Sequence, residues 1–255
     1  MLNRILDRRF LCIAAGTPLV VIIAMAVGEQ ALLLRLKAQA SSRPPTPLTV
    51  RFNERIGTGD KTFEKQLVIS IRSDGSESEL RRGWSPVSGT IEERYTVRDM
   101  SARVRVAVDT PTASKTTYPL EEGHMRAILA KRNDCSPPQN APSKQILGTT
   151  AYQVVRALPD PGNTIREAWV APDAGCLALV ERFTQQSNGQ SVVMTERIAT
   201  ELTWGEPAST YFAIPAGYVE REPSAVMIER SRRYPGAPAG KLQVQDDAYR
   251  SANKK

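Results

Sequence analysis

Apolar and polar residues alternate along most of the chain between residues 48 and 204. Val104, Val106 and Val108, for example, are separated by charged or small residues, and the long segment 190–204 follows the same period of two. Successive side chains of a strand point to opposite faces, so this period predicts strands with one buried and one solvated face. Such strands are typical of antiparallel sheets.

Turn sequences separate the alternating segments. Asn188-Gly189 is the pair that a type I′ hairpin turn favours, and Asp74-Gly75 gives the same signal earlier in the chain. The pattern predicts one short helix near 122–131 and nine strands, near 48–56, 62–73, 77–83, 89–98, 102–109, 150–158, 164–171, 177–186 and 190–204.

Consecutive hairpins of this length form a curled antiparallel meander. The predicted fold is therefore mainly β: a half-barrel-like sheet with one short helix, preceded by an N-terminal hydrophobic helix. We expect Trp84, Trp169 and Trp204 to face inward together with the aliphatic residues.

The N-terminus has the layout of an export signal. Residues 1–10 hold three arginines and one aspartate and precede the apolar run Leu11 to Val27. The basic end stays inside, which predicts that the chain from about residue 40 onward is exported. The Ala24-Met25-Ala26 motif favours cleavage after Ala26, giving a periplasmic or secreted protein. Apolar residues resume at Ala31 and favour an uncleaved inner-membrane anchor instead, with the body in the periplasm.

The composition along the chain predicts a division into four segments. Residues 1–40 are expected to be a signal peptide or signal anchor, 41–47 a Pro-rich linker, 48–230 the antiparallel β domain and 231–255 a disordered basic tail. The formal net charge of +7 is spread along the chain and almost all aromatic residues occur singly, so we expect no nucleic-acid binding.

Three cysteines occur, of which Cys12 lies in the apolar run. Cys135 and Cys176 form an even pair in an oxidising compartment, which favours a disulfide over two separate buried thiols. With one histidine, His124, the chain cannot complete a four-ligand zinc shell. We expect neither a metal nor a cofactor.

Catalytic patterns are weak. No nucleophile stands near His124, and Glu92 and Glu93 are adjacent on a strand, so they point to opposite faces. Phosphate-binding and dinucleotide-binding glycine motifs do not occur. We expect a non-enzymatic protein with no catalytic residue. A hydrolase with carboxylates from separate strands is the remaining alternative.

Several polar residues fall on apolar faces of the predicted strands. Glu93 shares a face with Tyr95, and Glu196 interrupts the stripe that ends at Trp204. Buried carboxylates need partners or water. They either form internal ion pairs with arginine or mark a partly wet, ligand-accepting concave face. In the second case the ligand-facing residues are Glu93, Tyr95, Trp169, Glu196 and Trp204.

The segment from Ile165 to Tyr218 carries a resemblance. Arg166-Glu167-Ala168-Trp169-Val170-Ala171-Pro172-Asp173 and the terminus Trp204-Gly205-Glu206-Pro207 to Ile214-Pro215-Ala216-Gly217-Tyr218 resemble a group of uncharacterised exported bacterial β-sheet proteins. The layout of the whole chain is also similar to the periplasmic lipoprotein-carrier (LolA-like) half-barrels. That resemblance implies a concave apolar face that cradles acyl chains.

These observations support three hypotheses. The first is a non-enzymatic cell-envelope protein that binds lipid or another apolar ligand on a concave sheet. The second is a membrane-anchored sensor or interaction domain that binds an envelope protein partner, and the third is the hydrolase. A dry apolar cavity favours the first hypothesis. A filled core with an exposed apolar patch favours the second.

Overall fold

The computed structural model describes residues 45–57, 62–85, 88–133, 135–159, 163–187 and 190–233. The chain divides into two compact units, Met1–Arg43 and Pro44–Lys255, and all described residues belong to the second. The expected N-terminal helix, the Asn188-Gly189 turn and the end of the tail lie outside the described residues. Within the described ranges, no helix is long and apolar enough to cross a membrane.

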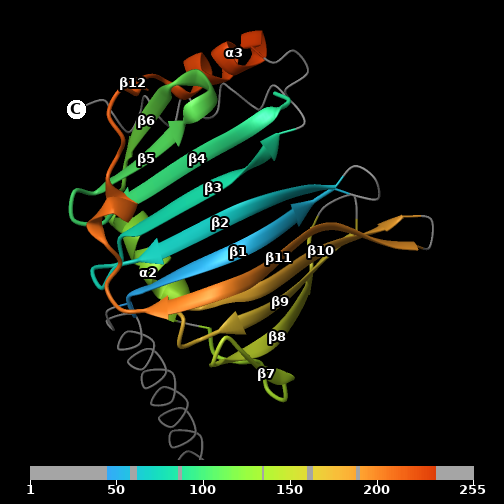
Figure 1. Ribbon diagram of the computed structural model, residues 1–255. Coiled ribbons are helices and arrows are strands. Elements are labelled where there is room, and N and C mark those ends of the chain that lie inside the picture. The colour runs from blue at the N-terminus through green and yellow to red at the C-terminus, as the bar shows by residue number, and fades with distance from the viewer. Residues whose placement is uncertain are drawn as a thin grey trace, which may run out of the picture. The chain divides into compact units, whose positions relative to one another are not determined.

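The second unit is built on one twelve-stranded sheet (Figure 1). Its strands are β1 (Leu48–Ile56), β2 (Phe63–Ile71), β3 (Glu77–Ser85), β4 (Thr90–Asp99), β5 (Val104–Asp109), β6 (Ser114–Pro119), β7 (Ser143–Ile146), β8 (Thr149–Ala157), β9 (Thr164–Ala171), β10 (Leu177–Ser187), β11 (Gln190–Trp204) and β12 (Val219–Glu220). The described helices are α2 (Glu122–Asn133), α3 (Pro223–Arg233) and the short 3₁₀ turns η1 (Thr110–Thr112) and η2 (Ser209–Phe212).

Two meanders make up the sheet. β1 to β6 pair in sequence order, β7 to β11 form the second meander, and antiparallel pairing of β1 with β11 joins the two. The strand β12 adds to β6 in parallel at one edge, and β7 forms the other edge. The sheet is therefore open, which confirms the predicted mainly-β, antiparallel and unclosed fold.

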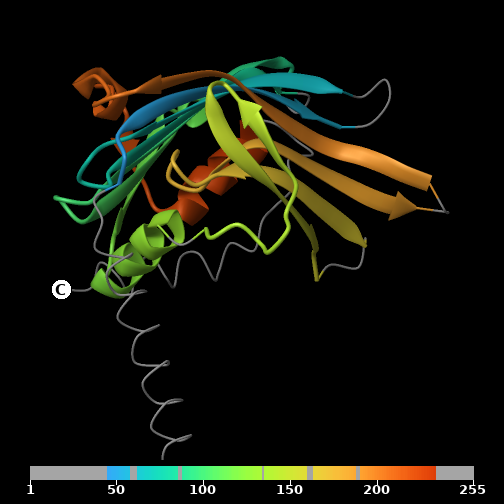
Figure 2. The same ribbon diagram turned by 90° about the horizontal axis from the view of Figure 1, so that it is seen from below.

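The sheet is curved, and α2 and α3 lie on its concave side (Figure 2). Arg132 of α2 forms an ion pair with Glu77 of β3, which fixes that helix to the concave face. Direct cross-strand neighbours point to the same face of a sheet. Glu77 is the neighbour of Ile71, and Ile71 is the neighbour of Leu48, so Ile71 and Leu48 also point to the concave side.

The main core lies on the concave side of β1 and β2. Its fully buried side chains include Leu48, Val50 and Phe52, which pair across the strands with Ile71, Ile69 and Leu67. Burial of each such side chain stabilises the fold by about 1.5–3 kcal/mol. The core is thus filled with the chain's own side chains.

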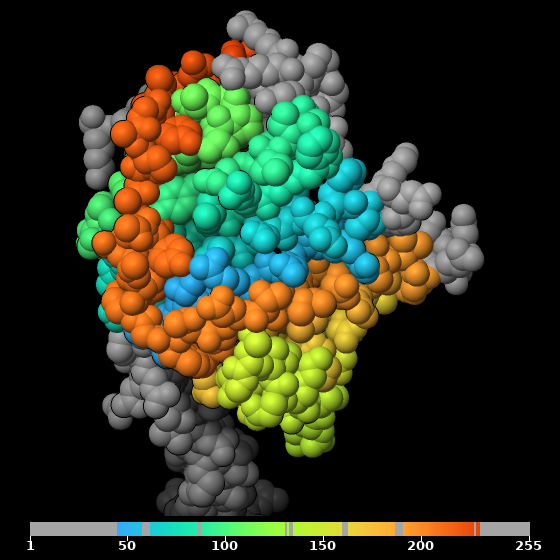
Figure 3. Space-filling model, in the orientation of Figure 1, coloured from blue at the N-terminus to red at the C-terminus, as the bar shows by residue number. Residues whose placement is uncertain are grey.

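A smaller core lies on the opposite, convex side of β3 to β5. Tyr95, Val97 and Val108 form its centre, and Phe212 and Ile214 from the segment after β11 pack against it. Figure 3 looks onto this face and shows the C-terminal segment crossing one end of the strands. The apolar side of the sheet therefore changes face along its width, whereas the sequence predicted one inward-facing apolar side.

Candidate functional site

A groove of about 480 Å³ lies on the convex face, near the ends of β2, β3 and β4. Strand register places six of its lining residues on that face: Asn53, Glu64, Gln66, Arg82, Trp84 and Ile91. Lys65 and Gly83 complete the lining. The volume falls within the usual range of small-ligand pockets, about 300–1,000 Å³.

The groove side chains form two rows that run across the strands. Asn53, Gln66 and Arg82 are direct neighbours on β1, β2 and β3, and Trp84 and Ile91 pair in the next row. Neighbouring strands lie about 4.8 Å apart, so the first row presents three polar groups at regular intervals. In the described part of the chain, none of these three polar side chains forms a hydrogen bond or ion pair with the protein.

Gly83 has no side chain, which allows β2 and β3 to lie close together beside the groove. A Cβ atom at this position would lie 2.6 Å from Lys65 Cγ, 2.7 Å from the backbone oxygen of Glu64 and 2.8 Å from Lys65 Cα. Two of these three atoms belong to the backbone, so a larger residue would force the strands apart. The glycine therefore sets the spacing between Trp84 on β3 and the polar row on β2.

Large apolar side chains stand exposed on this face. Trp84 is 47% exposed and Ile91 63% exposed, and Ile198 of β11, the cross-strand neighbour of Asn53, is 42% exposed. The expectation that Trp84 faces inward is wrong, because the apolar cover of β3 on this side is confined to the other end of the strand. Exposed tryptophan and isoleucine beside an arginine are typical of recognition surfaces.

The middle of the concave face carries paired charges. Arg166 Nε and Arg197 Nη2 contact the two carboxylate oxygens of Glu181 at 2.6 and 2.5 Å. Arg81 Nε lies 3.5 Å from Glu54 Oε2. Both glutamates are buried, and a buried carboxylate needs such a partner. These groups are structural ion pairs that cross the sheet.

Lys65 reaches this concave charge row from β2, where it is the neighbour of Glu54. Burial, followed by the positive charges of Arg94 and Arg81, lowers the pKa of Lys65. The amine therefore lies in surroundings that disfavour a further positive charge.

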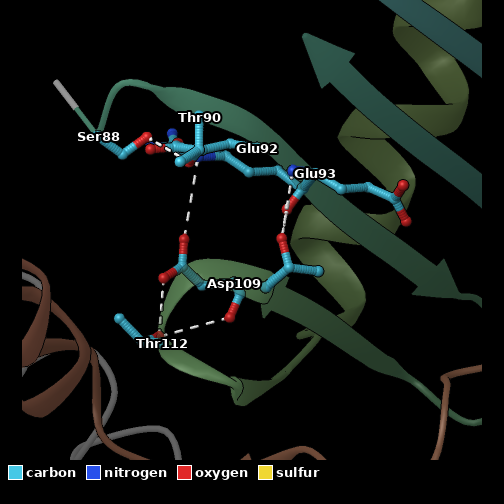
Figure 4. Close-up of polar contacts among 8 residues, drawn as sticks. Ser88, Thr90, Glu92, Glu93, Asp109 and Thr112 are labelled. Atoms are coloured by element: carbon cyan, nitrogen blue, oxygen red, sulfur yellow. Dashed lines mark hydrogen bonds and ion pairs between the residues drawn. The ribbon is translucent and has the colours of Figure 1, made fainter. Parts of the chain in front are cut away.

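A second cavity, of about 270 Å³, lies between α3 and the concave face of β4 to β6. Its strand side is polar: Thr112 Oγ1 donates a hydrogen bond to Asp109 Oδ2 at 2.7 Å (Figure 4). Arg94 Nε lies 4.0 Å from Asp109 Oδ1. Arg94 Nη2 also lies 3.8 Å from Glu92 Oε2. The α3 side contributes Val226. This cavity is below the usual size of ligand pockets.

The structure places the expected ligand-facing residues in separate environments. Tyr95 is buried in the convex core, where its hydroxyl donates a hydrogen bond to the backbone oxygen of Tyr211. Burial raises the pKa of Tyr95 to about 12. Glu93 lies on the same face, two residues along β4 toward the groove, and is the cross-strand neighbour of Arg82.

The other three candidates lie on the second meander. Glu196 forms ion pairs with Arg55 at 3.3 Å and Arg182 at 2.5 Å. Trp169 is partly buried against the main core, with a lysine amine 3.9 Å from its ring centre. Trp204 ends β11 opposite Leu48 and is 46% exposed. The five residues therefore do not meet in one place.

The structure contains the expected disulfide between Cys135 and Cys176. It links the segment after α2 to the turn between β9 and β10. Ala174 in that turn belongs to the main core. The disulfide therefore joins the segment after α2, a helix on the concave side, to the second meander.

The described residues do not form a metal-binding arrangement of side chains. No group of three or more histidine, cysteine, aspartate or glutamate side chains there is arranged to hold a metal ion. His124 is exposed on α2.

Sequence reasoning missed Asn53, Gln66 and Arg82. They are ordinary polar positions on the solvated side of three strands, and only strand register brings them into one row. One signal was present in the sequence of β2: its second half, Leu67–Ile71, is almost entirely apolar, whereas its first half is mostly polar. In the structure the second half is buried on both faces and the first half is not. That contrast marks where the cover of the convex face ends.

No protein-family model and no curated protein matches the sequence. Among solved structures the chain is similar to MucB (TM-score 0.40, 14% identity, covering 70% of this chain and 60% of that one). It is also similar to MucB in the MucA/MucB complex of Pseudomonas aeruginosa (TM-score 0.39, 16% identity, 72% and 60%). A LolA superfamily protein from Nitrosomonas europaea also matches (TM-score 0.32, 10% identity, 71% and 97%). The chain spans about 60% of the length of MucB, and at these TM-scores the likeness is limited to the general course of the sheet.

Proposed function

We propose that the protein is an exported, non-enzymatic binding protein of the cell envelope, and that it takes its ligand in the convex groove. The groove itself carries this proposal: a hollow of about 480 Å³ in which an exposed tryptophan and isoleucine stand beside a row of solvent-facing polar side chains. Apolar surface of this kind is retained where it contacts a ligand.

Export is supported by two independent features. The basic and then apolar N-terminus has the layout of an export signal or inner-membrane anchor. The disulfide Cys135–Cys176 suits an oxidising compartment, such as the periplasm.

A binding role without chemistry is supported by the state of the buried carboxylates. Glu181, Glu54 and Glu77 each have at least one arginine partner, so their charges are committed to the fold. A general acid or base needs a carboxyl whose proton is shared with a substrate instead.

The expected lipid ligand on the concave face is a weaker alternative. The concave side of β1 and β2 is filled by core residues such as Phe52 and Leu67, and the neighbouring region carries the charge row. An acyl chain would have to displace the core side chains or cover the charged side chains. Burying those charges without water is unfavourable.

Photo-crosslinking in living cells tests the proposal. A benzophenone amino acid replaces Ile91 in the groove, and a control chain carries it at Val155 of β8, where exposure is 61% against 63%. We expect a specific adduct with an envelope component from position 91 only. Equal or no adducts from the two positions contradict the groove as the binding site.

A further inference from the structure

We infer that the convex groove binds a saccharide chain, with a sugar ring stacked on Trp84 and its hydroxyls bonded to Asn53, Gln66 and Arg82. This inference rests on the proposed function, since it names the ligand class of the same groove. It follows from four features of the groove: an exposed aromatic ring, a row of polar side chains, a backbone whose hydrogen bonds are mostly made within the sheet, and the close packing of β2 against β3.

The platform is the half-exposed indole of Trp84 with Ile91 beside it on β4. The C–H face of a pyranose ring is apolar and carries partial positive charge on its hydrogens, so it stacks on the negative face of an aromatic ring. An indole that keeps about half of its surface open beside a hollow offers such a face.

The polar row matches the alternating chemistry of sugar hydroxyls. Each hydroxyl both donates and accepts, and the amides of Asn53 and Gln66 do the same, while Arg82 donates several hydrogen bonds. Within the described residues these three side chains have no protein partner, so a ligand need not break existing bonds to reach them.

Most of the groove backbone is already paired. Asn53, Gln66 and Arg82 lie in the ladders that join β1, β2 and β3, and the β2–β3 ladder ends at the Lys65–Gly83 pair. Beyond that pair, Glu64 is paired with β1 and Trp84 with β4. An extended peptide recognised by strand addition needs a long free sheet edge, whereas only the two end residues of β2 and of β3 lie beyond the ladder that joins these strands. An acyl chain would cover the polar row without replacing its hydrogen bonds to water, which is unfavourable.

The strands β2 and β3 are closely packed at the point where the two rows meet. Gly83 allows β2 and β3 to approach so closely that a single added carbon would contact backbone atoms at 2.7–2.8 Å. The spacing between the indole of Trp84 and the amide of Gln66 is thereby set before any ligand arrives. Recognition groups held in place in this way lose little entropy on binding.

Isothermal titration calorimetry of the full chain with purified oligosaccharides tests the inference. The probes are N-acetylglucosamine trimer, maltotriose, cellotriose and galacturonic acid trimer. We expect at least one probe to bind, Trp84→Ala to weaken its affinity by about tenfold or more, and Gln66→Ala to weaken it by about threefold.

Trp204→Ala is the matched control, because Trp204 has nearly the same exposure but lies on the other face, opposite Leu48. Its affinity is expected to stay within about twofold of the wild type, and thermal unfolding checks that each variant is folded. Absence of binding by all four probes, or equal losses in the two tryptophan variants, would overturn the inference. If position 91 still crosslinks in cells while no probe binds, the proposed function stands and the saccharide assignment fails.

Discussion

Replacement of Glu77 by glutamine is expected to lower the free energy of unfolding by about 3–5 kcal/mol. Glu77 Oε2 accepts hydrogen bonds from Arg98 Nη1 at 2.7 Å and from Arg132 Nη2. The side chains of Glu77 and Arg132 are only 10% and 9% exposed. Glutamine keeps the shape of the side chain and removes its charge, which leaves two arginines side by side without a counter-ion.

The guanidinium of Arg132 is expected to stay charged at neutral pH in the Glu77→Gln variant. Burial lowers the pKa of Arg132 to about 10, which is still well above neutral pH. The guanidinium therefore cannot avoid the loss of its partner by releasing a proton, and α2 is expected to loosen from β3. The helix also packs Leu129 against the turn at Gly75, so that contact weakens with it.

Urea denaturation measures the loss of free energy, and thermal unfolding measures the fall in Tm, both followed by circular dichroism. In a domain of this size 1 kcal/mol corresponds to roughly 2–4 °C in Tm, so the expected fall is roughly 6–20 °C. Glu79→Gln is the matched control on the same strand face: its ion pair with Arg81, at 3.2 Å, is about a third exposed and is worth about 0–1 kcal/mol.

A double-mutant cycle separates lost charge from lost packing. Glu77→Gln alone leaves Arg98 and Arg132 without their counter-ion, and Arg132→Met alone leaves Glu77 with Arg98 as its one arginine partner. In the double variant the buried Arg132 charge is absent, so it is expected to lose clearly less stability than the sum of the two single variants. The reasoning is refuted if Glu77→Gln costs no more than Glu79→Gln, or if the two single losses simply add.

Three further predictions concern other parts of the fold. Replacing Cys135 and Cys176 by serine opens a loop with a sequence separation of 41 and is expected to cost about 4 kcal/mol in guanidinium denaturation; a loss below about 1 kcal/mol would contradict this. Gly83→Ala should cost about 1–3 kcal/mol by overpacking and should also weaken binding in the groove, so an unchanged Tm counts against the close strand approach. The backbone N–H of Ala102, which donates to Asp99, lowers the pKa of that carboxyl. Its stabilising contribution is present above the unfolded pKa of about 4 and is lost as pH falls through the lower folded pKa, so Asp99→Asn should flatten the stability–pH profile on the acid side.

Local alternation was sufficient to predict the strands whose faces differ strongly in polarity. β1 begins and ends where expected because Leu48, Val50 and Phe52 alternate with polar residues, and each contacts a matching apolar residue on β2. The helix near Glu122 was also found. The turn at Gly75 is confirmed by its positive φ of 88° and by the hydrogen bond from its N–H to the oxygen of Arg72.

Elements whose existence depends on distant partners were missed. The strand β6 (Ser114–Pro119) is mostly polar and has no alternating apolar signal, yet it pairs with β5 after a sharp reversal in which Ala113 has a φ of 49°. The strand β12 has only two residues and forms only because β6 offers an edge. The charged helix α3 was not predicted: residues 223–230 were assigned to the β domain without a helix, and residues 231–233 to the disordered tail.

The location of the groove could not be read from one strand at a time. Alternation shows that Trp84 and Arg82 share a face, but it does not show whether that face is covered. The cover comes from Phe212 and Ile214, more than a hundred residues further along the chain, and it stops before it reaches Trp84. The sequence therefore predicted a tryptophan in the core where the structure has one at the surface.

Fluorine NMR of protein containing 5-fluorotryptophan tests the location of binding most directly. The chain has three tryptophans, so single replacements by phenylalanine assign every resonance. When a soluble extract of the cell envelope is added, we expect the signal of Trp84 to shift or broaden while those of Trp169 and Trp204 stay in place. A response from Trp169 or Trp204 with Trp84 unchanged would contradict a binding site on the convex face.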